Sequence, residues 1–371
     1  MKIVCTGYGT LAPGTNDSQE FLSHIQEGEC VLTYQENAGP KGESNIVGLI
    51  NEEIESYTSD KAYKRFPKAA ILGIAAAKEA IQQAELDTEK PKIGLFVGTS
   101  LGGLGEGDLQ NGVSYGQAGE HRRVPIMAAH YANYHSIAAS INHELGLKGL
   151  TRTISTGCTA GLEAIEEAML YLHSGKIDTA IVCGTDIAIT QATTYAFSKL
   201  RNLPFDQSLD EGAVPFSDKS KGFAMADGAG VVIMEREQSA LDRGGTIRGE
   251  IQQVVSNNDG TGLFSTDTEG KQLKKALHEV VQNQHVDFVN SQALGVQVND
   301  RMEEACSFEL FGHKVPFTSI KSTFGNPFAA GGVFQVISSL LSIEHGFIPG
   351  TTRTDQSGFE SMNIVTKSVK Q

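Results

Sequence analysis

Cys158 is the side chain of this sequence best placed to act as a nucleophile. It follows a β-branched run, Thr151–Ser155, that predicts a strand, and it precedes apolar residues at helical spacing, Leu162, Ile165 and Met169. The start of a helix offers unpaired N–H groups and a partial positive charge, which favour a thiolate. Although a free cysteine is usually buried and inert, this strand, turn and helix predict a nucleophile turn with a lowered thiol pKa.

Composition excludes several classes of function. The chain has 371 residues, a net charge of −14 and no Trp, and the absence of a basic run argues against a nucleic-acid partner. Its five cysteines form no CxxC pair, which fits a reducing, cytoplasmic compartment. The chain opens directly on a strand-like segment, so we expect no signal segment, and no apolar run approaches the ~20 residues of a membrane span. The glycine-rich stretch Gly98–Gly103 lacks a P-loop lysine, and no His, Cys and Asp grouping has zinc spacing, so we expect no cofactor and no metal.

Strand and helix patterns alternate in two series. The first series predicts strands over Lys2–Thr6, Ile93–Val97, Ala180–Val182 and Gly230–Met234, and helices over Ala62–Ala84, Tyr131–His143 and from Cys158 to about Ser174. The second predicts strands over Gly249–Ser256 and Phe288–Asn290, and helices over Gly270–Gln284, Met302–Phe311 and Gly331–His345. This repetition indicates two α/β halves with buried, mostly parallel sheets, divided near residues 235–246.

Five motifs in order along nearly the whole chain resemble those of elongating β-ketoacyl synthases of bacterial fatty-acid and type II polyketide synthesis. The motifs are Thr6–Thr10, Val97–Gly103, Thr156–Gly161, Pro215–Gly230 and Lys321–Gly332. The resemblance implies a thiolase-like fold of two similar halves in a five-layer αβαβα arrangement, and it implies a dimer. It divides the chain into a nucleophile-bearing half, residues 1–240, and a second half, residues 241–371.

The sequence departs from this family at both catalytic histidines. Gln292 stands where the first histidine belongs, and Asn326 replaces the second, while Lys321 and Glu303 match the family's supporting residues. Neutral amides still donate hydrogen bonds but do not serve as acid or base near pH 7. Gln292 and Asn326 are therefore expected to form a weak oxyanion site that drives decarboxylation poorly.

The segment that closes the second half also differs from the family. Ketosynthases continue to a Phe-Gly-Gly-Thr-Asn loop, whereas this sequence stops at Val365–Gln371. Either the sequence is truncated, or the second half of this member lacks the usual final strands. His130 and His135 lie in a segment that borders the acyl pocket in the family, but packed or surface positions are the simpler interpretation. Asp227 is interpreted as a turn residue.

Two functions of different classes remain open. The first is a ketosynthase-like acyltransferase that carries an acyl chain on Cys158, accepts it from an acyl carrier protein or acyl-CoA, and decarboxylates weakly or not at all. The second is a non-catalytic partner similar to a chain-length factor beside an active ketosynthase. The first predicts an acyl group on Cys158. Either assembly is expected to be a dimer, homotypic or with a ketosynthase.

Overall fold

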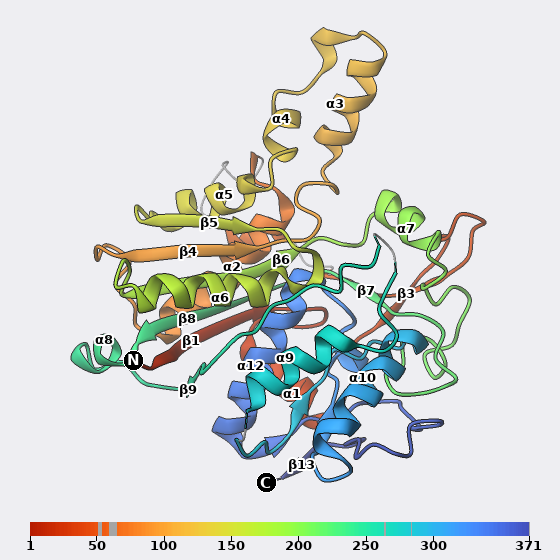
Figure 1. Ribbon diagram of the computed structural model, residues 1–371. Coiled ribbons are helices and arrows are strands. Elements are labelled where there is room, and N and C mark those ends of the chain that lie inside the picture. The colour runs from red at the N-terminus through yellow and green to blue at the C-terminus, as the bar shows by residue number, and fades with distance from the viewer. Residues whose placement is uncertain (51–53, 59–64, 263–264, 283, 371) are drawn as a thin grey trace.

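A six-stranded sheet forms the centre of the molecule (Figure 1). The computed structural model describes residues 1–50, 54–58, 65–262, 265–282 and 284–370. The strands of the sheet, in spatial order, are β5 (Leu150–Ile154), β4 (Ile93–Gly98), β6 (Thr179–Asp186), β8 (Gly228–Arg236), β1 (Ile3–Leu11) and β9 (Gly249–Glu250).

The sheet is mixed rather than mostly parallel. Strand β4 pairs in parallel with β5 and β6, whereas the β6–β8, β8–β1 and β1–β9 pairs are antiparallel. The expectation of mostly parallel strands is therefore wrong. The reason is that a strand buried on both faces gives the same continuous apolar run in either direction, so its sequence does not report its orientation.

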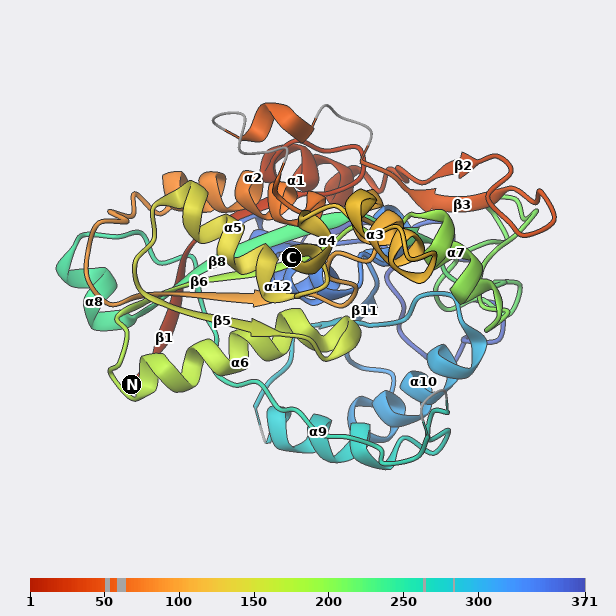
Figure 2. The same ribbon diagram turned by 90° about the horizontal axis from the view of Figure 1, so that it is seen from above.

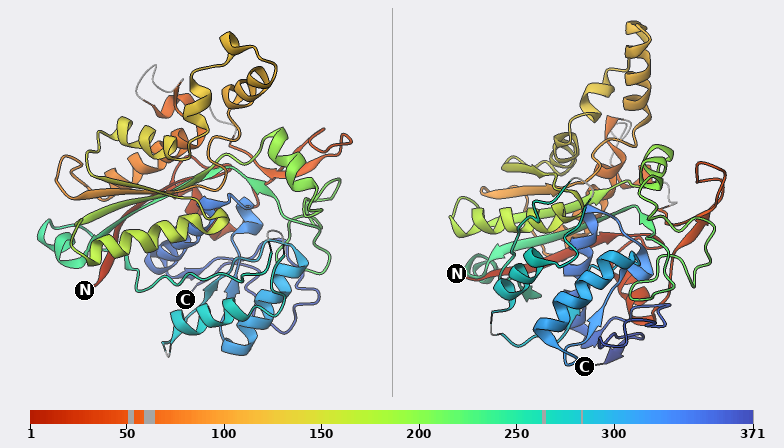
Figure 3. Two further views of the ribbon diagram at one scale, coloured as in Figure 1. Left: turned by 45° about the horizontal axis from the view of Figure 1, so that its top comes forward. Right: turned by 45° about the vertical axis from the view of Figure 1, so that its right-hand side comes forward.

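Helices cover both faces of the sheet. One face packs against α2 (Lys68–Gln83) and α5 (His135–Leu145), and the other against α6 (Ala160–His173) and α12 (Ala329–His345). Beyond α6, a further layer contains α9 (Lys271–Val281) and α10 (Gln297–Phe311), so α6 lies between the large sheet and α9 (Figures 2 and 3). The helix that carries the nucleophile turn is thus an inner layer.

Short strands and helices complete the fold. A parallel pair joins β10 (Val289–Asn290) to β11 (Phe317–Thr318), and an antiparallel pair joins β12 (Phe347–Ile348) to β13 (Val369–Lys370). Among the described residues, the other elements are α1 (Ser18–Glu27), β2 (Thr33–Gln35), β3 (Asn45–Gly48), α3 (Gly107–Gln117), α4 (Met127–Tyr131), α7 (Gln191–Ser198), β7 (Met225–Ala226), α8 (Glu237–Asp242), α11 (Lys321–Phe324) and the 3₁₀ turns η1 (Ile54–Tyr57), η3 (His121–Arg123) and η4 (Gly157–Thr159). Helices α3 and α4 project away from the sheet as an arm (Figure 1). No helix in the described ranges is both long enough and apolar enough to cross a bilayer.

Several expected boundaries are corrected by the structure. The helix expected over Ala62–Ala84 runs from Lys68 to Gln83, directly after Pro67, and residues 62–64 lie outside the described part of the chain. The helix expected over Tyr131–His143 is two helices, α4 and α5. The strand expected over Gly249–Ser256 pairs only at residues 249–250, and residues 251–256 have no regular secondary structure.

Candidate active site around Cys158

The nucleophile turn has the predicted strand-to-helix geometry. Strand β5 ends at Ile154, Gly157 adopts φ +79°, and the 3₁₀ turn η4 carries Cys158 into α6. A side chain at Gly157 would be strained, since positive φ favours glycine. The half-buried thiol therefore sits where the first turn of α6 leaves the sheet.

Close backbone packing fixes this turn against α12. A Cβ on Gly161 would lie 2.1 Å from the carbonyl oxygen of Ala329, and one on Gly184 would lie 2.5 Å from the same oxygen. Only glycine allows the starts of α6 and α12 to approach this closely. The motifs that contain Cys158 and Asn326 are thereby held together although they are far apart in the sequence.

The environment of Cys158 disfavours the thiolate. Burial raises the pKa of the thiol and the nearby Asp186 carboxylate raises it further, whereas a hydrogen bond from the Asn326 side chain and the charge of Lys321 lower it. The net direction is upward, so the expectation of a lowered thiol pKa is wrong. Desolvation at this position outweighs the helix N-terminus, whose effect on charge is modest.

Asp186 organises the loops around the thiol, and sequence reasoning missed it. Its buried carboxylate accepts hydrogen bonds from Thr99 Oγ1 (2.9 Å) and from the backbone N–H groups of Ser100 (3.0 Å), Leu101 (2.8 Å) and Ala329 (2.9 Å). Burial raises the pKa of Asp186 to about 6. The backbone N–H groups of Ser100 and Leu101, in the glycine-rich loop, are thus bound to a carboxylate of the protein.

Asn326 lies beside the thiol, as its motif predicts. Its backbone is held by β-type pairing, with its N–H donating to Ala224 O at 2.8 Å and its carbonyl oxygen accepting from Ala226 N at 3.0 Å. The residue is 3% exposed, and its side-chain oxygen Oδ1 has no hydrogen-bond partner among the described residues. The Asn326 amide therefore offers one donor to Cys158 and keeps one unused acceptor.

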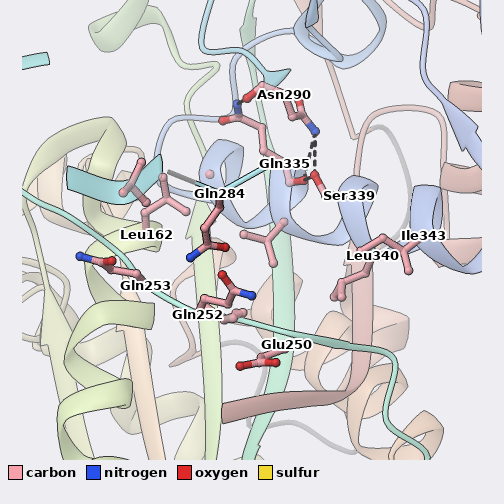
Figure 4. A pocket seen from close by; sticks show the side chains of 14 residues that line it. Leu162, Glu250, Gln252, Gln253, Gln284, Asn290, Gln335, Ser339, Leu340 and Ile343 are labelled. Atoms are coloured by element: carbon pink, nitrogen blue, oxygen red, sulfur yellow. Dashed lines mark hydrogen bonds between the residues drawn. The ribbon is translucent and has the colours of Figure 1, made fainter. Parts of the chain in front are cut away.

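Lys321 is buried next to this pair. Its ammonium donates to Gln335 Oε1 at 3.3 Å, and the Gln335 amide in turn donates to the carbonyl oxygens of Asn290 (2.8 Å) and Ser291 (2.9 Å). Burial lowers the pKa of Lys321 to about 8, so both protonation states are accessible near neutral pH. Sequence reasoning found Lys321 but missed Gln335, which contacts the lysine from α12. Figure 4 shows Gln335 beside Asn290.

Gln292 and Glu303 lie together, and the Glu303 carboxyl interacts electrostatically with Lys321. The backbone N–H of Gln292 donates to Glu303 Oε1 at 3.1 Å, and burial raises the pKa of that carboxyl. The Gln292 side chain is exposed and lines a cavity of about 860 Å³ together with Thr156, Thr159 and Glu303. Among the described contacts, Asn326 bonds to the thiol and Gln292 does not.

An aromatic cluster packs on the other side of Cys158. Phe328 lies between Phe197, at 5.3 Å between ring centroids, and Phe223, at 6.3 Å. Phe328 itself adopts φ +49°, a strained conformation for a bulky residue that is typical of functional sites. The partly buried Cys158 side chain packs against this apolar cluster.

The weaker candidates have other partners. His135 bonds through Nδ1 to Thr153 Oγ1 at 2.8 Å, and His130 contacts the Tyr131 ring. The buried Asp227 accepts from the backbone N–H groups of Ala188 (2.8 Å) and Ile189 (3.1 Å), as a residue that holds a turn does. Within the described ranges, no group of three or more His, Cys, Asp or Glu residues is arranged to hold a metal ion.

A cysteine at a strand-to-helix turn, with a second inner helix starting beside it, defines the thiolase-like ketosynthase fold. The solved structure of "the ishigamide ketosynthase/chain length factor" superposes with a TM-score of 0.88 at 21% identity, covering 100% of this chain and 93% of that one. At that identity, the likeness shows the fold alone.

Sequence comparisons give the family. The β-ketoacyl synthase N-terminal domain model matches residues 1–240, and the C-terminal domain model matches residues 248–355. The chain is 26% identical to the "putative polyketide beta-ketoacyl synthase 1" of Streptomyces halstedii, over 94% of this chain and 87% of the relative. It is 25% identical to the "3-oxoacyl-[acyl-carrier-protein] synthase 1" of Escherichia coli K12, over 99% and 92%. This protein belongs to the β-ketoacyl synthase family, whose members generally transfer acyl groups.

Proposed function

We propose that this protein is a divergent ketosynthase-like acyltransferase of fatty-acid or polyketide biosynthesis that carries an acyl chain on Cys158. The observation that carries this proposal is the intact thiol at the turn, hydrogen-bonded by Asn326 and beside the buried Lys321. The acyl chain would extend along the aromatic cluster around Phe328. The donor would be an acyl carrier protein or acyl-CoA thioester.

The reaction needs few groups. The Cys158 sulfur attacks the thioester carbonyl carbon, a new C–S bond forms, and the donor thiol leaves with its bonding electrons. The Cys158 proton passes to the departing thiolate, so the step neither consumes nor releases an oxidant. Lys321 has a pKa of about 8. Its protonated form stabilises the transient thiolate by its positive charge, and this stabilisation is lost when the lysine is deprotonated. The Asn326 amide keeps the sulfur in place.

Decarboxylation is the step that this site supports poorly. In the resembling ketosynthases, two histidines stabilise the enolate oxygen, and loss of one such donor commonly costs about 3–4 kcal/mol. Here the second histidine position holds Asn326, which is buried. The first holds Gln292, whose side chain is exposed. We therefore infer acyl transfer without efficient condensation.

Acyl exchange between two thiols tests this proposal. Purified protein is incubated with octanoyl-CoA and radiolabelled pantetheine, and labelled octanoyl-pantetheine is measured. Exchange that depends on Cys158 and disappears in Cys158→Ala supports a covalent carrier, because the acyl group must wait on the enzyme between the two thiols. Equal exchange by wild type and Cys158→Ala would refute it.

A second candidate is a chain-length-factor-like partner subunit, and the exposed Gln292 favours it. Strand β5 is an edge strand of the large sheet and is partly exposed along its length, so it offers a pairing surface to a second chain. A homodimer or a heterodimer with a ketosynthase would use this edge.

Light scattering of the protein by itself, and of the protein co-expressed with a ketosynthase, tests this assembly. A silent partner would leave the product of the pair unchanged in Cys158→Ala, whereas a carrier would change it.

A further inference from the structure

One short stretch of chain, Ser319–Asn326, carries both Lys321 and Asn326, and it is called here the site turn. It follows β11, passes through α11 and ends at Asn326, which bridges to β7. Helix α11 is a single turn of four residues, and so short a helix does not hold its own position. Contacts from other parts of the chain must therefore fix where the Lys321 ammonium lies relative to Cys158.

The end of the site turn is attached through the backbone of Asn326. Its N–H donates to Ala224 O at 2.8 Å, and its carbonyl oxygen accepts from Ala226 N at 3.0 Å. Gly325 comes just before it and has φ +79°, a conformation that favours glycine and bends the chain sharply. The attachment at Asn326 therefore does not by itself fix Lys321 at the other end of the bend.

The start of the site turn is attached to the segment 351–353. Thr351 Oγ1 accepts from the backbone N–H of Ser319 at 2.9 Å, and the backbone N–H of Thr352 donates to Ser322 Oγ at 2.8 Å. Ser319, Ser322 and Thr351 are fully buried. The two contacts lie on either side of Lys321 in the sequence, so the segment 351–353 holds the part of the turn that carries the lysine.

Arg353 ties the site turn to a second loop, residues 209–213. Its Nη2 donates to the carbonyl oxygens of Ser322 (2.9 Å) and Ala213 (2.9 Å). Its Nη1 donates to the carbonyl oxygens of Gly212 (3.1 Å) and Leu209. One guanidinium thus bridges the two segments, as its planar fork of N–H donors allows.

Two features of Arg353 are energetically costly. No Asp or Glu carboxylate of the described residues lies within 4.0 Å of its guanidinium, and its buried Nε has no hydrogen-bond partner among them. A buried charge without a counter-ion is unfavourable, and burial lowers the pKa of this guanidinium. The backbone of Arg353 also has φ +65°, which is rare for a residue with a side chain. Such costs are typical of residues that serve a functional site.

We propose that Arg353 is a positioning residue whose guanidinium fixes the site turn and so holds the Lys321 ammonium near the Cys158 sulfur. This inference rests on the proposed function, in which Lys321 stabilises the transient thiolate. Arg353 itself acts only through the turn, because its hydrogen bonds go to backbone carbonyl oxygens of Ser322 and the loop 209–213.

The substitution Arg353→Gln should displace Lys321. It would leave carbonyl oxygens of the turn and the loop without a donor, and buried acceptors without donors are unfavourable. The turn and the loop are therefore expected to move apart, and Lys321 moves with the turn. Its positive charge, which lowers the pKa of the Cys158 thiol, then acts from a greater distance.

Alkylation of Cys158 by iodoacetamide, followed by peptide mapping over a pH series, detects this displacement without an acyl donor. Arg353→Gln and Lys321→Met should each move the pH profile upward by about one unit, the usual effect of losing one nearby charge. The double variant should show no further rise beyond Lys321→Met, because the arginine acts through the lysine. Additive rises in the double variant, or an unchanged profile in Arg353→Gln, would overturn the proposal.

Arg353→Lys separates the bridging geometry from the charge. It keeps a positive charge, but its single nitrogen does not reproduce the fork that joins the turn to the loop. The alkylation profile should therefore rise in Arg353→Lys as well. A wild-type profile in this variant would show that charge alone matters and would overturn the proposal. Where Arg353→Gln does not fold, Arg353→Lys takes its place in the comparison with Lys321→Met.

Arg301→Gln is the matched control for a general loss of stability. Arg301 also joins two segments, through the Gly358 carbonyl oxygen and the Asp218 carboxylate, but neither belongs to the site turn. Urea denaturation should show that Arg353→Gln and Arg301→Gln both destabilise the fold. Only Arg353→Gln should move the alkylation profile, and an equal rise in Arg301→Gln would overturn the proposal.

Acyl exchange separates this inference from the proposed function. Arg353→Gln should slow the exchange that depends on Cys158 about tenfold, the equivalent of one pKa unit, and it should have no further effect in Lys321→Met protein. Wild-type exchange together with an unaffected Arg353→Gln variant would overturn the positioning role alone. A wild-type protein without exchange, whose alkylation profile still moves in Arg353→Gln, would overturn the proposed function alone.

Discussion

At the scale of the residue, the protonation of Cys158 distinguishes this site from one that holds a free thiolate. Burial, followed by the Asp186 carboxylate, raises the thiol pKa, and the Asn326 hydrogen bond opposes it. We predict that iodoacetamide alkylates Cys158 slowly at pH 7, and that the rate rises with pH above the usual range of a free thiol. Asn326→Ala should move the pH dependence of the alkylation rate to still higher pH, because it removes the hydrogen bond that lowers the thiol pKa. Peptide mapping of the alkylated residue over pH 6–10 measures both profiles, and rapid alkylation at pH 7 with an inflection below pH 8 would contradict this picture.

The replaced histidines give a second prediction at this scale. Gln292→His together with Asn326→His should raise malonyl-thioester decarboxylation at least about 10²-fold, the usual effect of one oxyanion donor. Release of labelled CO₂ measures it. Gln117→His, on the exposed arm helix α3, is the matched control and should leave the rate unchanged. A wild-type decarboxylation rate equal to that of an ordinary ketosynthase would contradict the proposed loss of decarboxylation activity.

At the residue scale, motifs indicated which residues lie near one another, whereas properties set by burial could not be read from the sequence. Cys158, Asn326 and Lys321 lie together in the structure, and their catalytic roles stay predictions. Gln292 lies in its expected motif, but its exposed side chain could not be foreseen, because exposure depends on distant packing. Asp186 could have been predicted as a site residue, because it is an acidic residue at the end of a buried strand. Gln335 has no such signal in the sequence.

At the scale of the element, the starts of α6 and α12 form one unit. Gly161→Ala would place a methyl group against the Ala329 carbonyl oxygen and force the helices apart. We predict a loss of about 1–3 kcal/mol in the free energy of unfolding, typical of overpacking. Acyl exchange should fall more than stability alone explains, because Asn326 shifts away from the thiol. Chemical denaturation and the exchange assay measure the two effects.

Gly116→Ala is the matched control for this prediction. It lies in α3 and would meet nothing within 4 Å, so stability and exchange should be unchanged or slightly improved. Normal exchange in a destabilised Gly161→Ala protein would show that the helix contact supports folding but does not position the site.

The type of each element was largely predictable from the sequence, whereas the pairing of the strands was not. Periodicity identified α6, α9 and α12 closely, because amphipathic and apolar helices have a clear repeat. The direction of β8 and the unpaired residues 251–256 depend on which strands become neighbours, and local sequence does not encode that. The division into halves at residues 1–240 and 241–371 stays a prediction.

At the scale of the whole molecule, three buried carboxyl groups link stability to pH. Burial raises the pKa of Asp300 to about 7 and those of Asp186 and Asp227 to about 6, from an ordinary value of 3.8. Between about pH 4 and pH 7, the folded state therefore binds more protons than the unfolded state, and stability should fall as pH rises.

Asp300→Asn isolates one contribution to this dependence. Its carboxylate accepts from the backbone N–H groups of Phe216, Leu294 and Gly295, so the variant should be less stable at every pH. Its stability should nevertheless change less between pH 4 and pH 7 than that of the wild type. Urea denaturation at a series of pH values measures this. A wild-type stability that rises across the window would contradict the assignment.

The central claim, that Cys158 carries an acyl group, is tested most directly by intact-mass spectrometry. Wild-type protein incubated with acetyl-, octanoyl- and palmitoyl-thioester donors should gain the mass of one acyl group, mapped by peptide analysis to Cys158, and Cys158→Ala should gain none. A protein whose Cys158 is reduced and accessible to alkylation, yet acquires no adduct from any donor, would contradict the claim and leave the partner-subunit function.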